Sequence, residues 1–139
     1  MLRTPSPSTH HSRRQRRGIL SAELLLTLPI LTILLFGLLE FSLLFFARGD
    51  VVEASRAGAR AARLYGATEG SIELLVRNSL GGRLAPSARV VADLGTRSGD
   101  EVSVAVVVPM AAAAPDLLWI IGYSLKGRDL ICETHMAKE

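Results

Sequence analysis

Apolar residues form one long run near the start of the chain, from Ile19 to Ala47, in which Glu23 and Glu40 are the only charged side chains. A membrane core about 30 Å thick is crossed by ~20 helical residues, so this run predicts a transmembrane helix at 19–47. The core of a signal peptide is shorter, about 7–15 residues, which favours a retained anchor over a cleaved secretion signal.

The helical pattern continues beyond the apolar run, over residues 48–65, which are rich in alanine and arginine. Small residues recur every fourth position at Ala54, Gly58 and Ala62. Such spacing allows another helix to approach closely, but alanine also favours helices for its own sake. Both interpretations of this segment stay open.

A change of period after residue 70 predicts a short helix followed by strands. Ser71 would cap a helix over 72–80, and Gly81 would end it. Three β-rich runs follow, at residues 88–94, 101–108 and 128–136. The first two are joined by a turn-forming connection, as in a hairpin. One long helix, one short helix and about three antiparallel strands make an α+β fold.

The connection at residues 110–125 contains an apolar knot, Leu117 to Ile121. Such a knot is either part of the domain core or a docking patch against the membrane or a partner. Of these two interpretations we favour the core.

Charge divides the chain into a basic leader at 1–18, the span at 19–47 and a domain at 48–139. Five of the sixteen basic residues and no acidic ones precede Gly18, whereas residues 19–139 carry eleven basic and thirteen acidic side chains, a formal charge of −2. The basicity therefore belongs to the leader, which is predicted to be disordered. No basic stripe with interleaved aromatic residues remains to bind nucleic acid.

The density of arginine beside the span favours a cytoplasmic N-terminus and an extracytoplasmic domain.

The side chains that usually carry chemistry are scattered along the chain. Cys132 is the only cysteine, so no disulfide can form within the chain. His10, His11 and His135 lack the spacing of metal ligands. There is neither a glycine-rich phosphate loop nor a nucleophile with a nearby base. We therefore expect no enzyme activity, metal, cofactor or small-molecule substrate.

The junction at Gly18 places an acid at the entrance of the span. Glu23 lies five residues after Gly18, and comparable charges at a helix centre cost ~2.5–3.5 kcal/mol on membrane-insertion scales. If a peptidase cuts after Gly18, the new amino group of Ile19 is a cation that can neutralise Glu23, in its own or in a neighbouring subunit. The alternative is a glutamate tolerated at the interface.

Glu40 stands near the other end of the span. It lies about 31 Å from Ile19 along an ideal helix, at 1.5 Å per residue, and so close to the far interface. There it either holds a subunit contact or reaches water among the headgroups.

A series of short motifs marks residues 16–62. They are Arg16-Arg17-Gly18, Ala22-Glu23, Leu28-Pro29, Phe36-Gly37-Leu38-Leu39-Glu40-Phe41 and Ala54-Ser55-Arg56-Ala57-Gly58-Ala59-Arg60-Ala61-Ala62. With these motifs the chain resembles the TadE-like family, minor pseudopilins of the tight-adherence (Flp-type) pilus and of related secretion systems. The resemblance implies cleavage by a prepilin peptidase after Gly18, insertion in the inner membrane and a periplasmic C-terminal domain.

The resulting hypothesis is a single-pass minor pseudopilin that acts in pilus assembly. Gly18 and Ile19 would form the processing site, and Glu23 and Glu40 would set register or assembly. Its partners would be other pilins or pseudopilins, the inner-membrane assembly platform, the prepilin peptidase and the lipid bilayer. Two rivals are an uncleaved membrane-anchored binding module without a pilus role and a soluble domain released by signal peptidase.

Overall fold

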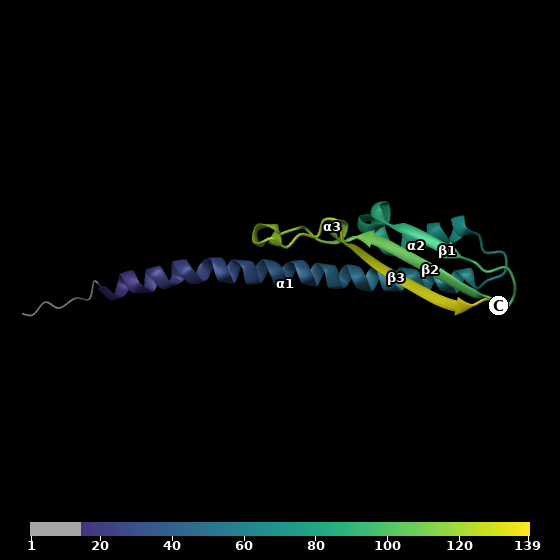
Figure 1. Cartoon of the computed structure of the whole chain (residues 1–139), viewed down its shortest axis with the longest axis horizontal. Coiled ribbons are helices and arrows are strands. Elements are labelled where there is room, and N and C mark those ends of the chain that lie inside the picture. Colours follow the sequence, from purple (N-terminus) through teal and green to yellow (C-terminus); the bar gives the residue numbers. More distant parts are fainter. Residues whose placement is uncertain (1–14) are drawn as a thin grey trace, which may run out of the picture. The chain divides into compact units, whose positions relative to one another are not determined.

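The computed structural model describes the backbone of residues 15–139 and the side chains from Ser21 onward (Figure 1). Its elements are α1 (Gln15–Ala62), α2 (Glu69–Leu84), the 3-10 turn η1 (Ala85–Ser87), β1 (Arg89–Asp93), β2 (Glu101–Pro109), α3 (Met110–Ala113), the 3-10 turn η2 (Leu118–Ile121) and β3 (Asp129–Ala137). The predicted α+β fold, with a long apolar N-terminal helix, a short helix and three antiparallel strands, is confirmed.

Helix α1 contains a stretch, Ser21–Ala62, that is long and apolar enough to include a membrane span. The helix begins at Gln15, so residues 15–18 of the predicted leader form its first turn. Residues 1–14, where the rest of the predicted disorder falls, lie outside the described residues. The chain divides into two compact units after Leu35, and α1 contributes to both.

The first unit exposes the apolar side chains of α1, as a membrane span requires. Two threonines of the described part of this unit turn their hydroxyl groups back to the helix. Thr27 Oγ1 donates to the carbonyl of Glu23 at 3.0 Å, and Thr32 Oγ1 donates to the carbonyl of Leu28 at 2.9 Å. Each hydroxyl is therefore satisfied without water, which suits an apolar surrounding.

The second unit is built on an antiparallel sheet with the order β1-β2-β3. The central strand β2 alternates strictly, and its inward residues Val102, Val104, Val106 and Val108 are fully buried. Together with Val51 and Ala54 of α1 and Ile72, Val76 and Leu80 of α2, these valines form the core of the unit. The other face of the sheet is half-buried or exposed, as the period of two along each strand dictates.

The small-residue stripe of α1 packs inside this core. Ala54, Gly58 and Ala62 are all buried. A methyl group added at Gly58 would lie 2.7 Å from Val76 Cγ2 and 3.0 Å from Val104 Cγ1. The stripe therefore allows α2 and β2 to approach α1 closely, so of the two open interpretations the close approach is the one observed, within the chain itself.

Helix α2 begins one turn earlier than the sequence predicted. Thr68, not Ser71, is the N-cap: its side chain accepts from the Ser71 backbone N–H at 3.3 Å, and the Ser71 hydroxyl accepts from the Thr68 N–H at 3.2 Å. This reciprocal pair is a capping box. The predicted break at Gly81 is present as a kink, where φ is 72°, and one further turn brings Leu84 into the core.

A buried serine ties α1 to the sheet. Ser55 Oγ donates to the carbonyl oxygen of Val104 at 3.0 Å and lies 2.7 Å from Thr134 Oγ1. One side chain thus fixes the helix against β2 and β3 at a single level, which sets the register between α1 and the sheet.

Candidate functional site

Gly18 and Ile19, the predicted processing site, lie in the first turns of α1. Their side chains fall outside the described set, so cleavage after Gly18 stays a prediction. Glu23 follows in the same helix with an exposed side chain. Its carboxylate is therefore accessible to a cation from a partner.

Glu40 is placed quite differently, because its side chain is 0% exposed. Its Oε2 atom accepts hydrogen bonds from the backbone N–H groups of Leu117 at 2.8 Å and of Leu118 at 3.1 Å. These N–H groups begin η2, and the first N–H groups of a helical turn have no partner within it. Glu40 therefore caps a turn that is remote in sequence, and its carboxylate does not reach out to water as one interpretation of the sequence expected.

The burial of the Glu40 carboxylate limits how much this contact can stabilise the fold. Its second oxygen, Oε1, is buried and has no hydrogen-bond partner among the described residues. A buried carboxylate costs several kcal/mol to desolvate, and a hydrogen bond to a charged group returns about 1.5–3 kcal/mol. The two bonds to Oε2 offset this cost in part, so the contact fixes the position of the loop more than it adds net stability.

The loop that Glu40 holds, residues 116–125, is closed at its base by Asp116. One carboxylate oxygen accepts from the Ser124 hydroxyl at 2.8 Å, and the other accepts from the Leu125 backbone N–H at 3.3 Å. At the far side Gly122 ends η2 with φ at 88°, a left-handed conformation that glycine adopts without strain. The 116–125 loop therefore has a defined shape.

Aromatic contacts join the same loop to α1. The ring centroids of Phe41 and Tyr123 lie 5.9 Å apart with their planes tilted by 45°. The guanidinium carbon of Arg128 lies 4.9 Å from the centroid of the Tyr123 ring, a cation–π contact. Leu118 lies over Gly37, where an added methyl group would be 3.8 Å from Leu118 Cδ1.

The apolar knot is divided by this arrangement. Leu118 is buried, whereas Trp119, Ile120 and Ile121 are 64%, 72% and 54% exposed. We call these three residues the loop tip. The preference for core is thus wrong for the loop tip, because η2 is a single turn and its one inward side chain is Leu118. The sequence did not identify the Leu117 and Leu118 amides as partners of Glu40. An acid inside an apolar run indicates that hydrogen-bond donors lie near it, but it does not indicate which residues supply them.

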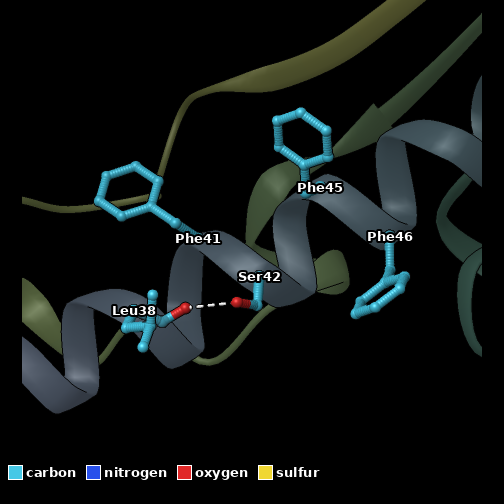
Figure 2. A pocket seen from close by; sticks show the side chains of 5 residues that line it. All are labelled: Leu38, Phe41, Ser42, Phe45 and Phe46. Atoms are coloured by element: carbon cyan, nitrogen blue, oxygen red, sulfur yellow. Dashed lines mark hydrogen bonds between the residues drawn. The ribbon is translucent and has the colours of Figure 1, made fainter.

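A shallow apolar groove of about 340 Å³ lies on the exposed surface of α1 (Figure 2). Its lining residues are Leu38, Phe41, Ser42, Phe45 and Phe46. Figure 2 shows the Ser42 hydroxyl directed at the carbonyl of Leu38, to which it donates at 2.7 Å. Because this hydroxyl is turned back to the helix, the groove presents aromatic and aliphatic carbon, a surface that suits lipid or another apolar helix.

The remaining polar clusters are small. The Asp100 carboxylate accepts from the backbone N–H of Arg97 at 2.7 Å and of Thr96 at 2.9 Å, and these bonds hold the pKa of Asp100 below its usual value. His135 Nδ1 lies 3.0 Å from Glu101 on an exposed face of the sheet. Within the described residues no group of three His, Cys, Asp or Glu side chains is arranged to hold a metal ion. Cys132 is half-buried and free.

Comparison with known families agrees with the N-terminal motifs. The family model described as TadE-like protein matches residues 18–60. The resemblance predicted from the sequence is therefore confirmed over this segment, which begins at Gly18 and includes Glu23 and Glu40. The match indicates a membrane protein associated with the Tad pilus. No curated protein and no solved structure was found to match the chain.

Proposed function

We propose that this chain is a minor pseudopilin that acts in the assembly of a Tad/Flp-type pilus or a related secretion machine. The observation that carries the proposal is the family match, which starts at Gly18 and continues through the whole apolar run. In that register Glu23 lies five residues beyond the glycine, exposed on α1. The exposed apolar side chains of the same helix supply surfaces for packing against other pilins.

Each site residue has a distinct part in this proposal. Cleavage between Gly18 and Ile19 creates an amino group whose charge pairs with the Glu23 carboxylate of the same or a neighbouring subunit. This pairing removes the cost of a lone carboxylate in an apolar surrounding. Glu40 acts indirectly, because its carboxylate is occupied by the Leu117 and Leu118 amides and so holds the 116–125 loop on the helix.

The proposed setting follows from the leader and the span. The arginines before Gly18 keep the N-terminus in the cytoplasm, α1 anchors the chain in the inner membrane, and the domain from residue 48 onward is periplasmic. The prepilin peptidase, the assembly platform, other pilins and lipid are the partners. The role is one of assembly and not of catalysis, without nucleic acid, cofactor or small-molecule substrate.

Expression of the full chain with and without its cognate prepilin peptidase tests the proposal. Mass spectrometry of the membrane fraction should find a chain that begins at Ile19 only when the peptidase is present. Gly18→Val should prevent this cleavage because a branched side chain then occupies the processing position. Gly49→Val is the matched control, since Gly49 lies in the same helix with no neighbouring atom within 4 Å of an added Cβ.

Two outcomes would contradict the proposal and favour a rival. An unchanged chain that retains Met1 in the presence of active peptidase would favour the uncleaved binding module. Release of the C-terminal half from carbonate-washed membranes would favour a soluble domain set free by signal peptidase.

A further inference from the structure

The loop tip is an uncharged, exposed apolar surface with a built shape. No charged residue occurs between Asp116 and Lys126, and the three tip residues each expose more than half of their surface. The loop is closed by the bonds of Asp116 at its base and by those of Glu40 at the start of η2. The exposure of the tip is therefore a property of a constrained loop and not of a frayed one.

The tip lies beside a part of α1 that is itself apolar on its exposed surface. Leu118, next to Trp119, packs over Gly37. Further along α1, Phe45 and Phe46 are 80% and 73% exposed, and the first charged residue after Glu40 is Arg48. Gly37 lies deeper in the apolar run than these phenylalanines. A lipid layer that covers Phe45 and Phe46 therefore also surrounds α1 at Gly37, where Leu118 packs on the helix.

The composition of the loop fits the interface of a bilayer. Tryptophan and tyrosine are enriched where the acyl chains meet the headgroups, and the tip combines Trp119 with two isoleucines. Two exposed basic residues, Lys126 and Arg128, follow the tip, and Arg128 stacks on the Tyr123 ring. Basic side chains at this level attract anionic lipid headgroups.

We propose that Trp119, Ile120 and Ile121 insert into the membrane leaflet that faces the C-terminal domain. The domain then has a second membrane contact beside α1, and Glu40 is the positioning residue that holds the inserted loop against the helix. The occupant of this surface is phospholipid: acyl chains around the tip, with anionic headgroups at Lys126 and Arg128. This inference depends on the membrane span but not on processing or on a pilus role.

The fluorescence of Trp119 tests the proposal directly, because it is the only tryptophan in the chain. The full chain is reconstituted at low protein density in vesicles of phosphatidylcholine with phosphatidylglycerol. Trp119 should emit at short wavelength, resist quenching by acrylamide and be quenched by lipids brominated on the acyl chain. The matched control is the double variant Trp119→Phe, Tyr65→Trp, which moves the reporter to a position that is 98% exposed, in the turn that follows α1. Its emission should be red-shifted and severalfold more sensitive to acrylamide.

Two results would overturn the inference. Acrylamide quenching of Trp119 equal to that of the control reporter would show that the loop tip faces water. A Trp119 shielded from acrylamide but insensitive to brominated lipid, or shielded only at high protein density, would show that another copy of the chain covers the tip. Neither result depends on cleavage after Gly18, so failure of this inference is distinguishable from failure of the pseudopilin proposal.

Discussion

The Oε2 atom of Glu40 and the backbone nitrogen of Leu117 lie 2.8 Å apart, although 77 positions separate the two residues in the chain. The contact joins the end of the apolar run to the loop between α3 and β3. The charged side chain of Glu40 in an apolar helix therefore has a structural role, and its partners belong to the same chain. The same contact fixes the position of the 116–125 loop on the helix.

Replacing Glu40 by alanine should destabilise the domain by about 1–3 kcal/mol, because the Leu117 and Leu118 amides lose their acceptor while the cost of burying the carboxylate disappears with it. Glu40→Gln should cost less, since its amide oxygen can still accept from the same donors. Thermal unfolding of the full chain in detergent measures the stability, and hydrogen exchange at the Leu117 and Leu118 amides locates the change.

The matched control for Glu40 is Glu53→Ala. Glu53 lies in the same helix but is exposed and pairs with an exposed Arg60 at 3.3 Å. Exposed pairs contribute about 0–1 kcal/mol, so this variant should leave both measurements nearly unchanged. Equal effects at Glu40 and Glu53, or protected Leu117 and Leu118 amides in Glu40→Ala, would rule out the hydrogen bonds between Glu40 and these amides.

Local patterns were enough to predict the two longer helices and the three strands, but not the single turn of α3 or the 3-10 turns η1 and η2. The valine-rich run predicted a strand over 101–108, and the structure has Glu101–Pro109. The apolar run predicted a long helix because a single run of this length crosses a membrane as a helix, which satisfies its own backbone. Capping was harder to predict: Ser71 and Thr68 both carry the required hydroxyl, and only their reciprocal bonds decide which of them caps the start of the helix.

The candidate site was less accessible to sequence reasoning. Glu40 was singled out because an acid in an apolar run is costly, but its donors are backbone groups, which every residue carries. Nothing in the side chains of Leu117 and Leu118 marks them as its partners. The exposure of the loop tip was equally hard to predict, because a run of apolar residues has the same composition whether it faces a core or a membrane.

The same substitution at two glycines of α1 should have opposite effects on stability. Gly58→Ala places a methyl group 2.7 Å from Val76 Cγ2 and 3.0 Å from Val104 Cγ1, and overpacking of this kind costs about 1–3 kcal/mol. Gly49→Ala meets no atom within 4 Å and should gain up to about 1 kcal/mol of helix propensity. Thermal unfolding of the two variants provides the comparison. Shifts of the same sign would contradict the close packing at Gly58.

The connection between β1 and β2 should weaken in acid through Asp100. Backbone bonds from Arg97 and then Thr96 lower the pKa of this carboxyl from its usual 3.8. A group with a lowered folded-state pKa stabilises the fold above its unfolded pKa, and this contribution is lost as the pH falls through the lower folded value. The stability gap between the wild type and Asp100→Asn should therefore shrink below pH 3.8. A carboxyl-carbon NMR titration of Asp100 with its midpoint at or above 3.8 would contradict this assignment.

Glu23→Ala should leave membrane insertion intact while abolishing pilus assembly, because in the proposed processed subunit the Ile19 amino group then has no counter-charge in the apolar helix. Glu23→Gln should fail in the same way, since it keeps the shape but not the charge. Thr27→Ala is the matched control one turn further along α1: its hydroxyl bonds only to carbonyls of its own helix, at 3.0 Å and 3.2 Å. Carbonate extraction measures insertion and electron microscopy measures piliation. Normal pili in Glu23→Ala would refute the assigned role, whereas loss of pili in both Glu23→Ala and Thr27→Ala would attribute the effect to the helix surface and not to the charge.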